Sequence, residues 1–67
     1  MQKFNIQATE KSKIELWDIN GNQIFFEKSF LSDRLMEINP GNIPIGIYFL
    51  KVSNENKISI KKITIIH

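Results

Sequence analysis

The sequence predicts an all-β fold, a small antiparallel β-sandwich of about six to seven strands. Apolar and polar residues alternate with a period of two along most of the 67 residues. Short clusters of Gly, Pro, Asn, Asp and Ser separate the alternating segments. Apolar residues nowhere recur at helical spacing for more than about one turn. Strands this short cannot bury both faces of one flat sheet, so we expect two packed sheets.

Three predicted strands occupy the first half of the chain. Residues 4–9 alternate regularly, and residues 13–19 are rich in β-branched and aromatic side chains. Asn20 and Gly21 then predict a type I′ hairpin turn, because both residue types tolerate the positive φ that its two central positions require. Residues 23–30 are expected to return as one continuous strand.

The second half alternates between strands and breaks. Ser32 and Asp33 interrupt the pattern, and the two prolines and two glycines between residues 39 and 46 predict a loop. At Lys61 and Lys62 the apolar positions shift by one residue, which predicts a β-bulge or kink there. The strands expected in this half are residues 35–38, 47–52 and 57–66, with a turn at 54–56.

A chain this short must gain its stability from packing and sheet pairing. It has no cysteine, so no disulfide can supplement the core. Alternating apolar positions flanked by polar residues predict the core side chains, which include Leu16, Phe26, Tyr48, Leu50 and Ile63.

Three residues have conformational roles at the entry to the strand 47–52. Pro44 fixes φ ahead of the strand. Gly46 is expected to let the backbone pass close beside an aromatic side chain, so that a valine there would crowd the fold. The hydroxyl of Tyr48 is expected to bond to nearby loop backbone, as a tyrosine corner does in immunoglobulin-like sandwiches, the kind of sandwich expected here.

The distribution of functional side chains argues against catalysis, cofactors and metals. The only histidine is the terminal residue His67, where no rigid triad can be held. Residues 41–46 match the first positions of a phosphate-binding loop but lack the Lys and the Ser or Thr that must follow. Residues 18–22 resemble the start of a calcium loop, but Gln23 stands in place of its glycine. We therefore expect a non-enzyme without cofactor or metal.

The charge pattern bears on possible partners. The net charge is +2, and the nine Lys and Arg residues are scattered, with only Lys61 and Lys62 adjacent. Nucleic-acid binders concentrate basic side chains on one face, so we expect no nucleic-acid partner. No apolar stretch is long enough to span a bilayer, so we expect no membrane insertion.

Three segments, in this order, resemble the C-terminal sorting domain of the type IX secretion system. Residues 14–24 are similar to that family's strand, Asp-x-x-Gly turn and return strand. Residues 43–52 are similar to its Leu-Pro-x-Gly-x-Tyr strand entry, and residues 61–67 to its lysine-bearing last strand. The residues that carry the resemblance are Asp18, Gly21, Pro44, Gly46, Tyr48, Lys61 and Lys62.

The resemblance implies a non-catalytic secretion signal that directs a cargo protein across the outer membrane. Its partners would be the type IX translocon, a sortase-like peptidase and an N-terminal cargo domain. The exported protein would pass through the periplasm and become secreted or attached to the cell surface. Residues 1–67 would form one sorting domain that lacks the family's first N-terminal strand.

An adhesive module is the alternative interpretation. The segment from Pro44 to Tyr48 also fits a fragment of a fibronectin type III or immunoglobulin-like repeat. Such modules usually continue into another domain, whereas this sequence stops soon after residues 63–66.

Overall fold

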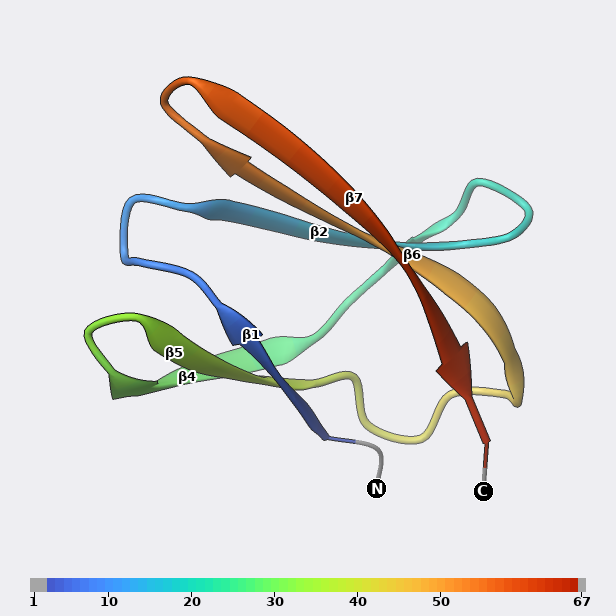
Figure 1. Cartoon of the computed structure of the whole chain (residues 1–67). Helices are drawn as coiled ribbons and strands as arrows, with labels where there is room; N and C mark the ends of the chain where they lie inside the picture. Colours follow the sequence, from blue (N-terminus) through green and yellow to red (C-terminus); the bar gives the residue numbers. More distant parts are fainter. Residues whose placement is uncertain (1–2, 67) are drawn as a thin grey trace.

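The computed structural model describes residues 3–66 and contains seven strands in two antiparallel sheets, with no helix among those residues (Figure 1). Met1, Gln2 and His67, the histidine of the lysine-bearing last segment, lie outside the described residues. The all-β sandwich predicted from the sequence is therefore confirmed. The strands are β1 (Phe4–Gln7), β2 (Lys13–Asp18), β3 (Gln23–Ile24), β4 (Glu27–Ser32), β5 (Leu35–Asn39), β6 (Gly46–Asn54) and β7 (Lys57–Ile65).

The chain crosses repeatedly between the two sheets. One has three strands in the order β1-β5-β4, and the other has four in the order β3-β2-β6-β7. The chain passes from one sheet to the other after β1, after β3 and after β5. Strands β5, β2 and β6 are flanked on both sides, which leaves β1, β4, β3 and β7 as edges.

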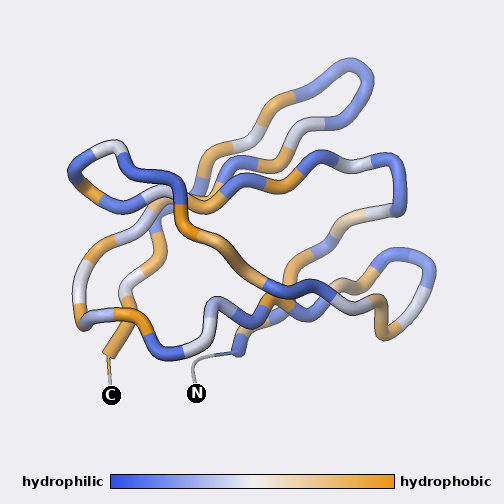
Figure 2. Tube along the Cα trace, turned by 180° about the vertical axis from the view of Figure 1, so that it is seen from behind, coloured by the Kyte–Doolittle hydropathy of each residue, from blue (hydrophilic) through white to orange (hydrophobic). Residues whose placement is uncertain are grey.

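The core lies between the sheets and comes from alternate positions of both. Figure 2 shows hydrophobic and hydrophilic residues alternating along much of the trace, as half-buried strands require. Of the predicted core, Leu16, Tyr48 and Leu50 are buried, while Phe26 and Ile63 are partly buried and pack against the core. The buried hydrophobic residues are Ile6, Ala8, Ile14, Leu16, Met36, Ile38, Tyr48, Leu50, Val52 and Ile65.

The continuous strand expected over residues 23–30 is wrong. The ladder stops after Ile24, and β4 begins at Glu27 in the other sheet. A chain that crosses between sheets has to leave the hydrogen-bond ladder, and here it does so at Phe25 and Phe26. Phe26 packs against the core, whereas Phe25 is 87% exposed.

The bulge expected at the lysine pair is also wrong. β7 pairs with β6 over nine residues without a register shift. The apolar positions change phase because Ile58 and Ile60 are exposed on the outer face, whereas Ile63 and Ile65 face the core. The register instead shifts in β4, between Phe30 and Ser32.

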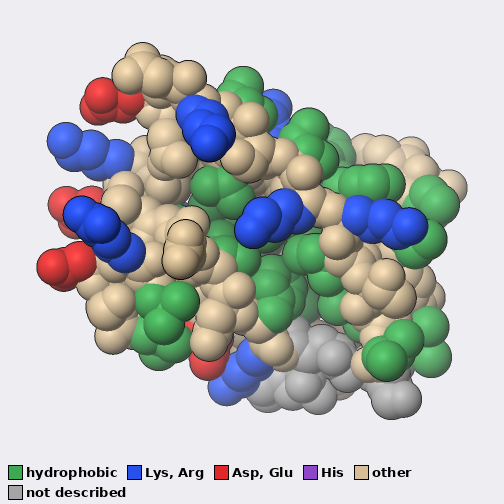
Figure 3. Space-filling model, in the orientation of Figure 1, with side chains coloured by type: hydrophobic (Ala, Val, Ile, Leu, Met, Phe, Trp, Pro, Cys, Tyr) green, Lys and Arg blue, Asp and Glu red, His purple; other side chains and the backbone are tan. Residues whose placement is uncertain are grey.

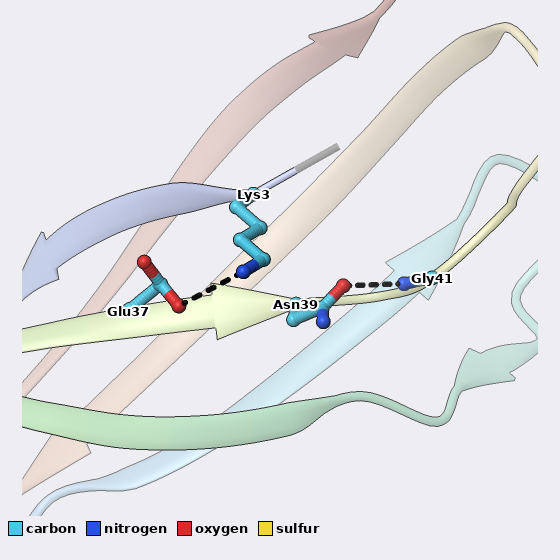
Figure 4. A network of polar contacts seen from close by, with 4 residues as sticks. All are labelled: Lys3, Glu37, Asn39 and Gly41. Atoms are coloured by element: carbon cyan, nitrogen blue, oxygen red, sulfur yellow. Dashed lines mark hydrogen bonds and ion pairs between the residues drawn. The ribbon is translucent and has the colours of Figure 1, made fainter. Parts of the chain in front are cut away.

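Two polar contacts shape the start of β1 and the exit from β5 (Figure 4). Lys3 Nζ lies 3.8 Å from Glu37 Oε1, an ion pair near the surface that contributes little to stability. The backbone N–H of Gly41 donates to Asn39 Oδ1 at 3.0 Å, and Gly41 has a φ of +75°. This local turn takes the chain out of β5 into the predicted loop, which is present over residues 40–45.

The two ends of the sandwich differ. The turns β1–β2, β4–β5 and β6–β7 lie at one end, while the described chain enters and leaves at the other (Figures 1 and 2). A hydroxyl bond ties two of these turns together, because Ser12 Oγ donates to Asn54 Oδ1 at 2.5 Å. Anything attached ahead of β1 would therefore begin at the end away from the three turns.

Candidate functional site

The hairpin between β2 and β3 is organised by Asp18. Its carboxylate accepts hydrogen bonds from the backbone N–H groups of Asn20 at 2.9 Å and Asn22 at 2.8 Å. Asn22 Nδ2 donates to the second carboxylate oxygen at 3.2 Å. These bonds to the charged form lower the pKa of Asp18, the bond from the Asn22 backbone being the largest cause.

The type I′ turn expected at Asn20 and Gly21 is wrong in its geometry. Gly21 N donates to Asp18 O at 3.1 Å, and only Gly21, with a φ of +87°, has a positive φ in this turn. The loop therefore has three residues, a turn followed by a left-handed glycine. Asp18 decides this register, because its carboxylate bonds the amides of the loop and a two-residue loop would not place them there.

The loop before β6 is closed by Tyr48. Its hydroxyl donates to the carbonyl oxygen of Pro44 at 2.7 Å, so the predicted bond to loop backbone is confirmed. The ring is buried at the same time, with 5% of its surface exposed. Tyr48 thus joins the loop 40–45 to the core through one side chain.

The close backbone approach expected at Gly46 is wrong, whereas the predicted effect of a valine there stays a prediction. A Cβ built on Gly46 would lie 4.0 Å from Tyr48 Cε1, an ordinary van der Waals distance. The φ of Gly46 lies outside the positive region in which glycine is required. The aromatic neighbour is the expected one, but the backbone is not held close against it.

Lys61 and Lys62 lie side by side on β7 and point to opposite faces of the sheet. Lys61 pairs with Leu50 and Lys62 with Phe49, and both lysines are exposed. Lys61 shares a face with Ile63 and Ile65 and is nevertheless exposed.

The four-stranded sheet brings all seven predicted site residues together. Asp18 on β2 pairs with Tyr48 on β6, which pairs with Ile63 on β7. Pro44 and Gly46 stand at the entry to β6, Gly21 follows β2, and the two lysines follow along β7. The three motifs thus meet on neighbouring strands, although about forty residues separate the first from the last.

The sequence pattern did not reveal the outer face of this sheet. Trp17, Phe49 and Lys62 form one row across it, with Phe49 37% exposed, and Ile58 and Ile60 lie on the same face. Figure 3 shows lysine and arginine side chains interspersed with hydrophobic ones on one side of the molecule. The missed signal was that the alternation in residues 57–66 also fits a strand with apolar residues on its outer face.

The described residues offer little for chemistry. Within residues 3–66 no three His, Cys, Asp or Glu side chains are grouped so as to hold a metal, and no buried side-chain polar atom lacks a hydrogen-bond partner. The same residues include no helix that is long and apolar enough to cross a membrane. A surface hollow of about 630 Å³ between the β1–β2 and β4–β5 turns is lined by Thr9, Glu10, Lys11, Phe30, Leu31, Ser32 and Asp33.

Comparison with known proteins identifies one family. The family model described as the secretion system C-terminal sorting domain matches residues 1–66. No curated protein and no solved structure matches the chain. Because that one model spans nearly the entire sequence, the chain belongs to the family of secretion system C-terminal sorting domains.

Proposed function

We propose that this domain directs an attached cargo protein across the outer membrane through the type IX secretion system and performs no catalysis itself. The observation that carries the proposal is the family match. In addition, the last strand of the chain, β7, is a sheet edge with two exposed lysines. The exported protein would then be secreted or held at the cell surface. The alternative, a fragment of an adhesive module, is not the family that this match names.

In this proposal the cargo and the translocon would lie at separate ends of the domain. A cargo joined ahead of Lys3 would begin at the end where the chain enters and leaves. The three turns at the other end, and the half of β7 that begins there, would stay open to the translocon. We expect a sortase-like peptidase to act on the junction between cargo and domain.

The seven site residues divide into structural and recognition roles in this proposal. Asp18, Gly21, Pro44 and Tyr48 would shape the turn and the loop, as their hydrogen bonds and φ values suggest. Gly46 has no steric task at its Cβ, and we assign it none. Lys61 and Lys62 are the candidates for recognition, because exposed lysines contribute little to stability and have no intramolecular ion pair among the described contacts.

A reporter graft tests the proposal. The domain is placed behind a folded reporter that carries an inner-membrane signal peptide, in a cell with a working type IX system. We expect the reporter to reach the surface or the medium. The graft is repeated with the residues encoded upstream of Met1 included. Retention in the periplasm in both forms would contradict the sorting role.

Recognition has to be separated from folding in this assay. Deleting residues from Lys61 onward removes the buried Ile65 and the partners of five β6 residues, so that deletion would unfold the sheet. Lys61→Gln with Lys62→Gln keeps strand length, and Lys11→Gln with Lys28→Gln is a matched control at two exposed lysines elsewhere. We expect export to fall only for the first pair, with an unchanged melting temperature for both. If the reporter were exported equally well with both pairs of substitutions, Lys61 and Lys62 would have no role in recognition.

A further inference from the structure

The backbone of β7 points half of its hydrogen-bonding groups at open solvent. The starting point is Asp18, whose N–H donates to Asn22 O at 2.9 Å and whose C=O accepts from Gly21 N at 3.1 Å. Both groups of Asp18 therefore point toward β3. In an antiparallel ladder this direction reverses at each residue, so those of Trp17 point toward β6.

The same alternation carries across the sheet. Trp17 pairs with Phe49, so Phe49 also points its groups toward β2, and the next residue, Tyr48, points toward β7. Tyr48 pairs with Ile63, which therefore bonds back to β6. The intervening β7 residues point their N–H and C=O groups away from the sheet; these are Ile58, Ile60, Lys62 and Thr64.

This edge is long, regular in its pairing and partly apolar. Nine consecutive pairs join β7 to β6 without a bulge, and no strand of residues 3–66 lies on its other side. The side chains of the four outward-pointing residues share the outer face, where Ile58 is 61% and Ile60 65% exposed. Unpaired strand edges of this kind are templates for an added strand.

A second copy of the chain fits this edge poorly. Two copies of β7 paired antiparallel overlap most when the middle residue, Lys61, stands opposite itself. Like charges directly opposite one another are destabilising. Lys51 lies beside Ile60 and adds to the positive charge, while the nearest carboxylate on β2, Glu15, already contacts Lys13 at 3.6 Å and Trp17 at 3.2 Å.

We propose that the β7 edge binds an extended acidic segment of a partner protein, which adds to the four-stranded sheet as an antiparallel fifth strand. The segment would place apolar side chains opposite Ile58 and Ile60 and carboxylates opposite Lys61 and Lys62. The proposal rests on the sorting role in one respect, since the translocon would supply the segment. Strand binding is measured in solution and export in cells, so that each can fail alone.

A synthetic strand peptide is the probe for the intact chain. The sequence Thr-Thr-Glu-Glu-Val-Thr-Val is complementary to residues 64 to 58 in antiparallel order. We expect it to bind, and the same peptide with both Glu replaced by Lys to bind at least about tenfold more weakly at low salt. Equal binding of the two peptides would overturn the charge assignment and with it the proposal.

Backbone methylation tests the mode of binding. N-methyl groups on the peptide residues opposite Ile58, Ile60 and Lys62 would block the donors that face β7. N-methyl groups on the alternate residues leave those donors free and serve as the control. We expect binding to be lost with the first set and kept with the second. Loss or retention in both would mean that β7 does not act as a strand template.

A pair of proline variants tests the protein side. Ile60→Pro removes an N–H that points outward, so the fold should persist while peptide binding is lost. Lys61→Pro removes an N–H bonded to β6 and should lower the melting temperature strongly. If Ile60→Pro binds the peptide like the parent, the edge is not the site. If Ile60→Pro binds no peptide but the reporter is still exported, the translocon does not supply the segment; the proposal is then overturned in that respect, and the sorting role stands.

Discussion

The two sheets end in edge strands that differ in almost every respect. β4 has six residues, all exposed, and one extra residue, Leu31, between the pairs that Phe30 and Ser32 make with β5. β7 has nine residues in unbroken register. A bulge twists an edge and interrupts its hydrogen-bonding row, which hinders pairing with another chain.

The difference shows two ways in which one small domain hinders unwanted pairing at an open strand edge. β4 is protected by its geometry, whereas β7 is regular and carries only lysines against unwanted pairing. An edge protected only by positive charge distinguishes between incoming strands. It repels a basic strand and attracts an acidic one. This is why we place recognition at β7.

The largest expected effect comes from a substitution that destabilises the sheet next to β7. Leu50 is 1% exposed and stands between Leu16 and Lys61 in the ladder. Leu50→Ala should lower the free energy of unfolding by about 2–5 kcal/mol, enough to unfold most of so small a domain. Phe30→Ala on β4, where the ring is 45% exposed, should cost about 1 kcal/mol. Urea unfolding followed by circular dichroism measures both, and equal losses would contradict the comparison.

The next effect concerns the other edge of the four-stranded sheet. Gly21 ends the turn into the short strand β3 with a φ of +87°, so Gly21→Ala should cost about 1–2 kcal/mol although nothing lies within 4 Å of the added Cβ. Gly46→Ala is the control, since its φ is ordinary and its Cβ would meet Tyr48 at 4.0 Å. We expect the control to stay within about 0.5 kcal/mol of the parent. A larger loss at Gly46 would restore the crowding argument.

A smaller effect appears in acid. The pKa of Asp18 is lowered in the folded state from its ordinary value of 3.8, so the folded chain binds fewer protons there than the unfolded chain. Its contribution is complete above the ordinary value and is lost as the pH falls through the lowered pKa. Asp18→Asn should therefore flatten the fall in stability below about pH 4. If the melting temperatures of parent and variant fell in parallel from neutral to acid pH, this prediction would be contradicted.

The smallest change in stability should accompany the clearest change in association. Lys61→Thr with Lys62→Thr removes the charge from the β7 edge and should alter the free energy of unfolding by no more than about 0.5 kcal/mol. Sedimentation velocity at rising concentration should then reveal dimers or larger species for the variant, while we expect the parent to remain monomeric. Lys28→Thr on the bulged β4 is the matched control and should remain monomeric. Association of both variants would show that the two edges are equivalent.

Local chemistry explains what the sequence predicted correctly. The period of two located β1, β2, β5, β6 and β7 to within a few residues, because burial of one face imposes that period on each strand separately. Three of five predicted core residues are buried and the other two pack against the core. The bond from Tyr48 to Pro44 was also predictable, since it spans four residues.

Local contacts around the candidate site residues were predictable, but the arrangement of these residues was not. Asp18, Gly21, Pro44 and Tyr48 act within short segments, where side chains and turn geometry decide the structure. That β2, β6 and β7 set these segments side by side depends on pairing between distant parts of the chain. The turn at Gly21 shows how far the sequence could predict the structure. The hairpin itself was predicted, but its three-residue loop depends on the hydrogen bonds of Asp18.

The sequence by itself determined the class of fold, the places of most turns, part of the core and the motifs of the family, because each follows from a few neighbouring residues. Only the tertiary structure decided where the chain breaks at Phe25 and Phe26, which strand carries the bulge and which strands become edges. It also decided that Ile58 and Ile60 face outward. An alternating strand fits either face equally well in isolation, and the choice is made by the strand it pairs with and the sheet that covers it.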